Sequence, residues 1–348
     1  MPTQLDHDTV SRLLIIKLRA IGDVLLSTIV TRNLREFFPK SEIHFLTERL
    51  SVDVLRGNPF VDTIVVYDRE TMTGADLIRQ VRRNGYDLVF DLFGNPRSAL
   101  VTYLSGARYR VGFRFRARAY AYNIVVPPRG GAVHNTQFNL DALEAVGVPI
   151  VDRNIYFTPS AEAERAAEGY FSQNLHASPF VVGINTGGGW YTKRWGLDRY
   201  ALLADRLAEL YGATILLTWG PGQLPEAREV ASLMKHAPLI PPTTSLSELG
   251  ALLKRCTVLI SNDSGPMHMA AAVGTPVLGI YGPTNPALQG PFGPRNLTVR
   301  NEGLDCLGCN LTTCPISHPC MQDLPVERVL AGVELLLKKN DIHPAARS

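Results

Sequence analysis

The chain has 348 residues, of which 45% are apolar and 19% are charged. A chain of this length buries large cores in about two domains, which excludes disordered, collagen-like and disulfide-stapled proteins. No apolar run reaches the ~18 residues that span a bilayer, and the first residues lack the pattern of a signal peptide. We therefore expect a soluble globular protein of the cytoplasm. The net charge of +3 is too small to indicate nucleic acid as a partner.

Short apolar segments alternate with helical patterns along the whole chain, which predicts parallel α/β sheets. In the first half the expected strands cover residues 13–18, 43–46, 63–67 and 86–92, with weaker ones near residues 110 and 125. In the second half they cover residues 180–185, 213–219, 256–261 and 276–281, and a final helix is expected over residues 326–339.

A proline-bounded helical segment, residues 149–179, joins the two series of strands and has no strand of its own. We therefore predict two doubly wound, Rossmann-like domains, residues 1–160 and 161–348. Ligands of such domains bind where strands end, so the turns that follow strands are the places to search for function.

The first such turn contains Gly22 and Asp23 at the start of a predicted helix. Glycine permits close approach of the backbone, and a carboxylate at a helix N-terminus stays ionised, which suits a general base. The alternative is that Asp23 only caps the helix by accepting hydrogen bonds from its free backbone N–H groups.

A second turn, residues 261–268, reads Ser-Asn-Asp-Ser-Gly-Pro-Met-His directly after an expected strand. Pro266 fits the first helical position, with Ser264 or Gly265 as the cap, so the free N–H groups of this turn predict an anion site. His268 lies in the same turn and can hydrogen-bond to a phosphate. The alternative is an ordinary capped helix with a packed histidine.

A third turn begins at Thr186 and contains three glycines, residues 187–189, followed by Lys193. The glycines let backbone N–H groups approach an anion, and Lys193 adds a point charge. The alternative is a plain flexible loop. No Gly-Lys-Ser/Thr motif is present and no Gly-x-Gly-x-x-Gly follows a strand, which disfavours a P-loop hydrolase and a nicotinamide-dependent dehydrogenase.

Residues 92–140 contain seven arginines and neither Asp nor Glu. Guanidinium groups match carboxylate and phosphate, so this window predicts an anionic acceptor. A solvated basic face is the alternative. The arginines that we expect to bind the acceptor are Arg97, Arg114, Arg116 and Arg118, and the window also contains Arg108, Arg110 and Arg129.

Four cysteines lie close together near the end of the chain: Cys306, Cys309, Cys314 and Cys320. In a cytosolic protein such a cluster is typical of a metal site or of reduced thiols rather than of disulfides. The opening Cys-x-x-Cys suits zinc, but the loop between the pairs is shorter than in common zinc modules. A structural zinc site and unliganded thiols both stay open.

Taken together and in this order, the motifs resemble glycosyltransferase family 9, the bacterial ADP-heptose:lipopolysaccharide heptosyltransferases. The resemblance extends over nearly the whole chain, through residues 14–18, Gly22-Asp23-Val24, Lys193-Arg194-Trp195, residues 262–268, residues 306–309 and Cys320-Met321. It implies a GT-B fold of two Rossmann-like domains that face a central cleft, with the acceptor on the first domain and the nucleotide sugar on the second. It also implies inversion at the anomeric carbon and no required metal or other cofactor.

By this resemblance Asp23 is the catalytic base and Lys193 binds the diphosphate. The family's ribose-binding Glu is absent from the turn after Trp219, where Gln223 or Glu226 stands in. The expected donor-binding residues are thus Thr186, Gly187, Lys193, Gln223, Glu226, Thr244, Asp263, Ser264, Gly265 and His268. The implied partners are ADP-heptose, an anionic lipopolysaccharide core and, in peripheral contact, the cytoplasmic face of the inner membrane.

Other functions use the same fold, so the fold alone does not choose among them. A family member could use another nucleotide sugar or another acceptor. A nucleotide-sugar epimerase or hydrolase would act on the donor with no acceptor present. A non-catalytic binding protein would leave the donor intact.

Overall fold

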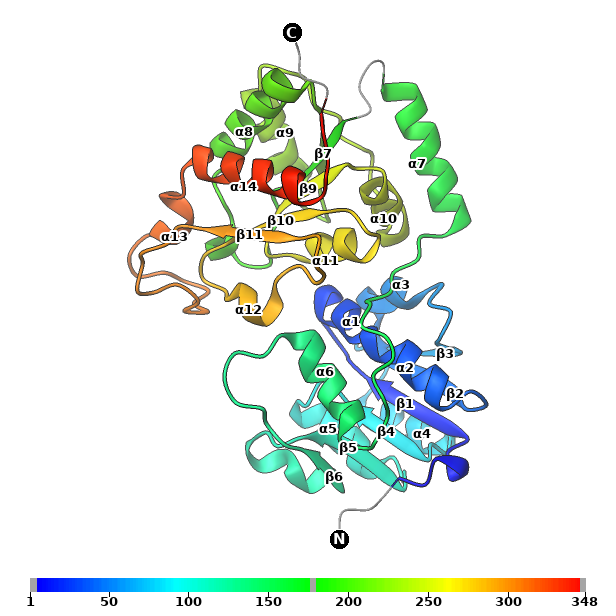
Figure 1. Ribbon diagram of the computed structural model, residues 1–348. Coiled ribbons are helices and arrows are strands. Elements are labelled where there is room, and N and C mark those ends of the chain that lie inside the picture. Colours follow the sequence, from blue (N-terminus) through cyan, green and yellow to red (C-terminus); the bar gives the residue numbers. More distant parts are fainter. Residues whose placement is uncertain (1–4, 176–179, 345–348) are drawn as a thin grey trace. The chain divides into compact units, whose positions relative to one another are not determined.

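The computed structural model describes residues 5–175 and 180–344, apart from the side chains of residues 7, 116 and 117 (Figure 1). The chain divides into two compact units, Met1–Phe157 and Thr158–Ser348. The expected boundary, after residue 160, lies three residues further along the chain than this division. Among the described residues, no helix is long and apolar enough to cross a membrane.

The first unit is built on a six-stranded sheet with the order β3-β2-β1-β4-β5-β6, in which every neighbouring pair is parallel. Residues 13–16 of β1 are fully buried, as a central parallel strand with both faces covered requires. The strands are β1 (Arg12–Ile16), β2 (Glu42–Glu48), β3 (Thr63–Tyr67), β4 (Leu88–Asp91), β5 (Tyr109–Phe113) and β6 (Ile124–Val126).

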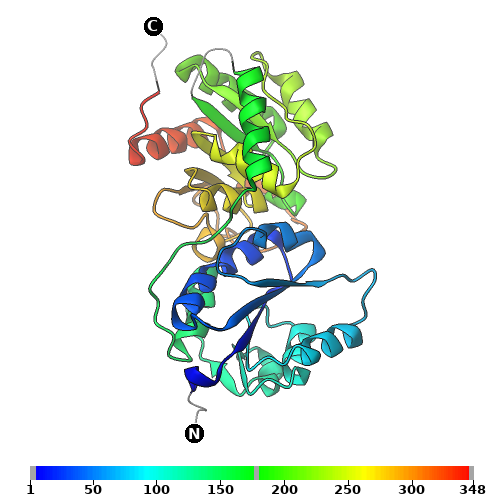
Figure 2. The ribbon, with the colours of Figure 1, turned by 90° about the vertical axis from the view of Figure 1, so that its right-hand side faces the viewer.

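Helices cover both faces of this sheet. Their bounds are η1 (His7–Thr9), α1 (Ile21–Ser27), α2 (Ile29–Phe37), η2 (Arg49–Ser51), α3 (Val52–Leu55), α4 (Gly74–Arg83), α5 (Pro96–Leu104), η3 (Arg116–Ala121) and α6 (Asn135–Glu144). Leu77 and Val81 of α4 and Val101 of α5 pack on Leu14 and Val89 of the sheet. Helices α4 and α5 thus share one face, and Figure 2 shows α1 and α2 on the opposite side.

The second unit contains a five-stranded parallel sheet with the order β11-β10-β9-β7-β8. Its strands are β7 (Val181–Asn185), β8 (Thr214–Thr218), β9 (Val258–Asn262), β10 (Val277–Tyr281) and β11 (Leu297–Arg300). Its helices are α7 (Ala161–Asn174), η4 (Tyr191–Lys193), α8 (Leu197–Tyr211), α9 (Leu224–Leu233), α10 (Leu246–Lys254), α11 (Gly265–Ala272), α12 (Pro286–Gln289), α13 (Pro319–Gln322) and α14 (Val326–Lys339).

Two apolar cores hold this second sheet. Helices α8, α9 and α14 pack on one side of it, and α7 and α10 pack on the other. Helix α14 spans the expected residues, and its Val329, Val333 and Leu336 are fully buried. The expectation of two doubly wound α/β domains is therefore confirmed.

Two details of the second sheet differ from the expectation. Strand β11 was not expected, because it lies at the edge of the sheet and only Val299 among its four residues is buried. Strand β9 begins at Val258 rather than at Cys256, because the Cys256 amide donates to the Leu253 carbonyl and still belongs to the turn after α10.

Each sheet has one topological switch point, where the chain order reverses beside the first strand. It lies between β1 and β4 in the first unit and between β7 and β9 in the second. In open α/β sheets, ligands bind outside the carboxyl ends of the strands at such a point. These two strand ends therefore position the candidate site residues.

Candidate active site

Asp23 lies at the switch point of the first unit, on the first turn of α1. The helix begins at Ile21 with Ala20 as its N-cap, so Asp23 occupies the third helical position rather than the cap. Its Oδ2 accepts a hydrogen bond from the Ala20 amide at 3.3 Å, and its side chain is only partly buried. A carboxylate held at a helix N-terminus and open to solvent can accept a proton from a bound hydroxyl.

Two buried charged residues beneath Asp23 were not expected from the sequence. Lys17 follows β1 and is 9% exposed, and its Nζ donates to the Leu92 carbonyl at 2.9 Å. Asp91 ends β4 and is fully buried, and it accepts from the Gly94 amide at 2.9 Å and from the Tyr122 hydroxyl at 2.7 Å. A lysine and an aspartate that end two apolar strands are the signal by which the sequence could have indicated them.

These two residues influence each other electrostatically. Burial lowers the pKa of Lys17, while the charges of Asp23 and Asp91 oppose that shift. Burial likewise raises the pKa of Asp91, against the hydrogen bonds that favour its ionised form. Asp23 and Asp91 therefore both lie close enough to Lys17 to favour its charged form.

Three of the four expected acceptor arginines have described side chains, and they follow β4 and β5. Arg97 is exposed on the first turn of α5 and lies over the Tyr67 ring, 5.4 Å from its centre. Arg114 is exposed, and Arg118 lies over the Phe115 ring at 5.5 Å. The side chain of Arg116 lies outside the described part of the structure.

None of Arg97, Arg114 and Arg118 forms an ion pair with a described acidic residue, so their charges are available. Arg129 differs, because it pairs with Asp141 at 2.7 Å and with Glu144 at 2.7 Å. These acids lie just beyond the acid-free window, so the window is less cationic in the fold than along the sequence.

The second switch point brings together Lys193 and Asp263, which are far apart in the sequence. Lys193 Nζ lies 2.7 Å from Asp263 Oδ2, and the two side chains are 13% and 7% exposed. Gln289 Nε2 also donates to Asp263 Oδ2, at 3.2 Å. The carboxylate thus holds the ammonium group at the carboxyl end of β9.

Asn262, which sequence reasoning did not single out as a site residue, fastens the glycine loop to this strand end. Its Nδ2 donates to the Thr186 carbonyl at 2.8 Å. Its Oδ1 accepts from the Trp195 amide at 3.3 Å and from the Tyr200 hydroxyl at 2.9 Å. Both ends of the loop that carries Lys193 are therefore tied to one side chain.

Helix α11 starts at this same edge. Its N-cap is Ser264 and its first residue is Gly265, so Pro266 occupies the second helical position rather than the first. Ser264 Oγ instead bonds to Ser261 Oγ at 3.0 Å and to Asn185 Oδ1 at 3.3 Å. Within the described residues no side chain caps this helix, which leaves its first turn suited to an anion. His268 is buried, at 5% exposure.

The expected ribose-binding residues lie next to the glycine loop. A Cβ on Gly187 would come within 2.7 Å of the Gln223 amide group, so a larger residue there would displace that side chain. Gln223 Oε1 accepts from the Gly220 amide at 3.0 Å, and Glu226 pairs with Arg194. The structure thus brings Gln223 and Glu226 to the Thr186 and Lys193 loop.

Thr244 lies apart from that group, beyond β8, in the segment that follows the bridge between Leu216 and Leu239. It lines a mostly apolar cavity of about 70 Å³ with Tyr170 of α7 and Leu252 of α10. This volume is well below the ~300 Å³ at which ligand pockets begin.

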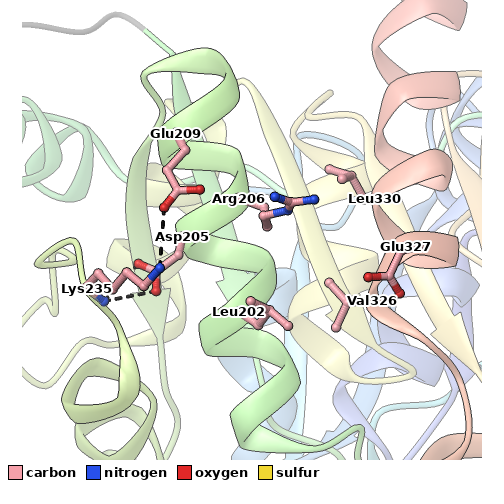
Figure 3. A pocket seen from close by; sticks show the side chains of 8 residues that line it. All are labelled: Leu202, Asp205, Arg206, Glu209, Lys235, Val326, Glu327 and Leu330. Carbon is pink, nitrogen blue, oxygen red and sulfur yellow. Dashed lines mark hydrogen bonds and ion pairs between the residues drawn. The ribbon is translucent and has the colours of Figure 1, made fainter.

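A larger cavity, of about 180 Å³, lies between α8 and α14 and contains none of the expected site residues (Figure 3). Two of its three acidic side chains, Asp205 and Glu209, interact with other groups of the protein. Asp205 accepts from the amides of Lys235 and His236, and Glu209 lies 3.8 Å from Lys235 Nζ. We therefore assign this cavity a structural role.

The four clustered cysteines lie in one region of the second unit. Burial, and then the charges of Cys306, Cys309 and Cys314, raise the pKa of Cys320 to about 11. Among the described residues, no three His, Cys, Asp or Glu side chains are grouped so that they could hold an ion. Cys320 is buried in α13, while Cys309 is exposed on the preceding loop.

The loop that carries the cysteines contacts the turn before Lys193. Thr192 is buried, and its hydroxyl donates to the Leu311 carbonyl at 2.8 Å. The Tyr191 ring lies edge-on to His318, with centroids 5.1 Å apart. The loop therefore supports the turn that carries Lys193.

The model of glycosyltransferase family 9 (heptosyltransferase) matches residues 75–318. The chain belongs to this family. It is 26% identical to lipopolysaccharide heptosyltransferase 3 of Escherichia coli strain K12, over 93% of this chain and 97% of that relative.

Two solved structures share its fold. The family 9 glycosyltransferase of Veillonella parvula has a TM-score of 0.83 at 24% identity and covers 97% of this chain and 99% of its own. The ADP-heptose lipopolysaccharide heptosyltransferase II of E. coli has a TM-score of 0.76 at 22% identity, over 95% and 99% of the two chains. The protein is therefore a glycosyltransferase of the GT-B fold.

Proposed function

We propose that this family 9 glycosyltransferase moves a heptose from ADP-heptose to the inner core of lipopolysaccharide, with inversion at the anomeric carbon. The observation that carries the proposal is the Lys193–Asp263 pair at the start of the uncapped helix α11. A cation and free N–H groups at one strand end suit a sugar diphosphate. The heptosyltransferase relatives support the choice of sugar and acceptor.

The reaction needs one base and one group of positive charges. Asp23 takes the proton of the acceptor hydroxyl while its oxygen attacks the anomeric carbon. The bond between that carbon and the diphosphate oxygen breaks, and ADP leaves with the bonding electrons. Because the nucleophile enters opposite the leaving group, the configuration inverts.

Lys193 and the first-turn N–H groups of α11 stabilise the charge that develops on the departing diphosphate. Before the donor binds, Asp263 holds Lys193 in place at 2.7 Å. The remaining donor contacts are proposed from the neighbouring turns: Thr186, Gly187, Ser264, Gly265 and His268 for the phosphates and sugar, Gln223 and Glu226 for the ribose, and Thr244 for the adenine.

The acceptor side uses Arg97, Arg114 and Arg118, whose guanidinium groups match phosphates and carboxylates. We propose the same role for Arg116. A lipid-linked acceptor also requires that the enzyme work in peripheral contact with the cytoplasmic surface of the inner membrane.

The positive charges that the step requires are present in the chain, and we therefore propose transfer without a metal. In the arrangement described here the four thiols do not fit a zinc ion, so no step is assigned to one. Activity that disappears after chelation and returns with a divalent ion would contradict this proposal.

A matrix of donors and acceptors tests the proposed function, with products identified by mass. We expect a product larger by one heptose only when ADP-heptose and a lipopolysaccharide core acceptor are both present. Consumption of the donor without an acceptor would instead indicate an epimerase or a hydrolase. Transfer of another sugar, or to another acceptor, would keep the chemistry and change the specificity.

A further inference from the structure

Helices α5 and η3 present an exposed pair of aromatic side chains on the first unit. Tyr103 and Tyr120 are 49% and 57% exposed, and their rings meet edge to face with centroids 5.5 Å apart. Leu100, one turn before Tyr103 on α5, is 43% exposed. A tyrosine that is free of the core suits a boundary between an apolar and an aqueous phase, because its ring is apolar and its tip is polar.

The packing of these helices accounts for the position of the pair. Val101 of α5 faces the sheet, and Ala99 forms a small buried cluster with Ala121 and Tyr122 at the end of η3. Tyr122 is anchored by its hydrogen bond to Asp91. The inner side of α5 therefore packs against the sheet and the end of η3, and Leu100, Tyr103 and Tyr120 lie outside the core.

The surroundings of the pair are cationic. Residues 74–126 contain nine arginines and three aspartates. Each aspartate is engaged elsewhere: Asp76 caps α4 and pairs with Arg79, Asp87 accepts from the Ser11 and Arg12 amides, and Asp91 is fully buried. Asp76 therefore offsets Arg79 of α4, and no other carboxylate of this span forms an ion pair with its remaining described arginines.

We propose that the α5–η3 surface, formed by Arg97, Leu100, Tyr103, Arg118 and Tyr120, docks on an anionic lipid bilayer. Exposed aromatic and aliphatic side chains flanked by arginines match the interface of a membrane with negative headgroups. The inference rests on the proposed function in one respect, because a lipid-linked acceptor supplies the reason for membrane contact.

The position of this surface fits that role. Arg97 lies on the first turn of α5, the helix that follows β4, and Arg118 lies on η3, which follows β5. Both therefore lie toward the carboxyl ends of these strands, where the acceptor is expected. Tyr103 lies two turns further along α5. A lipid-linked acceptor would therefore reach the arginines from the same membrane that the tyrosines contact.

Vesicle sedimentation tests the proposal with the whole protein. Wild type and a Tyr103→Ser/Tyr120→Ser variant are mixed with vesicles of phosphatidylcholine, alone or with an equal part of phosphatidylglycerol. The control, Leu233→Ser/Leu335→Ser, removes two side chains of similar exposure, 51% and 60%, from the second unit. A Leu100→Ser variant reaches the same surface without touching the tyrosines, and thermal melting checks that every variant folds.

We expect wild type to bind the anionic vesicles about tenfold more tightly than the neutral ones, and added salt to weaken that binding. The tyrosine variant should lose about tenfold in affinity for anionic vesicles, Leu100→Ser should lose less, and the control should match wild type. On a delipidated acceptor in solution the tyrosine variant should work at the wild-type rate, because the change lies outside the reacting groups.

Three outcomes would overturn the proposal. These are equal sedimentation of the tyrosine variant and wild type, equal binding of wild type to neutral and anionic vesicles, and a wild-type dimer in solution that the variant loses. The third outcome would assign the surface to a second copy of the chain. Transfer to the delipidated acceptor tests the proposed function separately. If wild type transfers no heptose there, the proposed function is wrong, and the vesicle experiment still tests the membrane surface.

Discussion

The switch points of the two sheets carry similar residue types in opposite arrangements. In the first unit, Lys17 and Asp91 are buried against protein groups, and Asp23 is left partly exposed above them. In the second unit, Lys193 and Asp263 pair directly with each other beside an uncapped helix. The first arrangement keeps a carboxylate available to accept a proton, and the second keeps a cation available for an anion.

The difference shows how one fold can supply two chemical functions. A base must remain accessible, and Asp23 stays partly exposed while its charged neighbours Lys17 and Asp91 are buried. A phosphate-binding cation must exchange its partner for the ligand, so its carboxylate partner lies at the surface of the same site. The following experiments test this contrast, beginning with the largest expected effect.

Replacing Asp23 by Asn retains the hydrogen bond to the Ala20 amide and removes the basicity. We expect the transfer rate to fall about a hundredfold or more, while ADP affinity stays unchanged. Transfer assays and calorimetry provide the two measurements. Asp53→Asn, which changes an aspartate of α3 in the same unit, is the matched control. A wild-type rate in Asp23→Asn would leave Asp23 with only a capping role.

Lys193→Met should weaken ADP binding about tenfold or more as well as turnover, because the product carries the same diphosphate charge as the donor. Lys254→Met is the matched control, since Lys254 also lies 2.7 Å from a carboxylate, that of Glu164, in the same unit. Calorimetry that finds equal ADP affinity for Lys193→Met and Lys254→Met would remove Lys193 from the diphosphate site.

The arginines of the first unit should act on the acceptor alone. The Arg114→Gln/Arg118→Gln variant is expected to raise the acceptor KM by about fivefold at low salt and to reduce its salt dependence. Arg129→Gln should leave the KM unchanged, because Asp141 and Glu144 already neutralise that side chain. If all three substitutions change the KM equally, the acceptor responds to the overall positive charge of the first unit rather than to particular binding residues.

The burial of Asp91 can be tested through the pH dependence of the free energy of unfolding. Burial raises the pKa of Asp91 above its ordinary 3.8, so the folded protein binds this proton more tightly than the unfolded chain. Wild type therefore loses stability through Asp91 as pH rises from 3.8 toward the higher folded value. The free energy of unfolding of Asp91→Asn, relative to wild type, should increase over that range.

Asp76→Asn should change the pH dependence of the free energy of unfolding in the opposite direction. Hydrogen bonds from Thr73 lower the pKa of Asp76 below 3.8, so its contribution to stability is present above that pH and is lost as the pH falls. The stability of Asp76→Asn relative to wild type should therefore decrease as pH rises toward 3.8. Denaturant titrations at several pH values measure both slopes, and equal slopes for the two variants would contradict the assignment of Asp91.

The smallest effect is expected from removal of metal. Because the four thiols are not grouped to hold an ion, a chelator should leave both the melting temperature and the initial transfer rate unchanged. Elemental analysis of protein purified without chelator should find less than about a tenth of an equivalent of zinc or iron. A full equivalent, with a lower melting temperature after chelation, would show that the loop closes around a metal.

Much of the fold could be read from local patterns. Apolar runs such as residues 63–67 predicted strands, and the spacing of Val326, Val329 and Val333 predicted the last helix. The spacing of apolar residues along the chain indicates which face of an element is buried. Strand β11 was not predicted, because an edge strand with one buried residue lacks a regular spacing of apolar residues. Motif order likewise selected Asp23, Lys193 and Asp263 as candidates.

The sequence by itself thus determined two parallel sheets, the family and the turns that hold the candidate site residues. Only the tertiary structure decided which charges meet. Lys193 and Asp263 are seventy residues apart, Asn262 joins both ends of the glycine loop, and Arg129 finds its acids outside the acid-free window. The physical reason is that periodicity indicates which side of an element is buried, whereas the pairing of charges at strand ends depends on the order in which strands lie in the sheet.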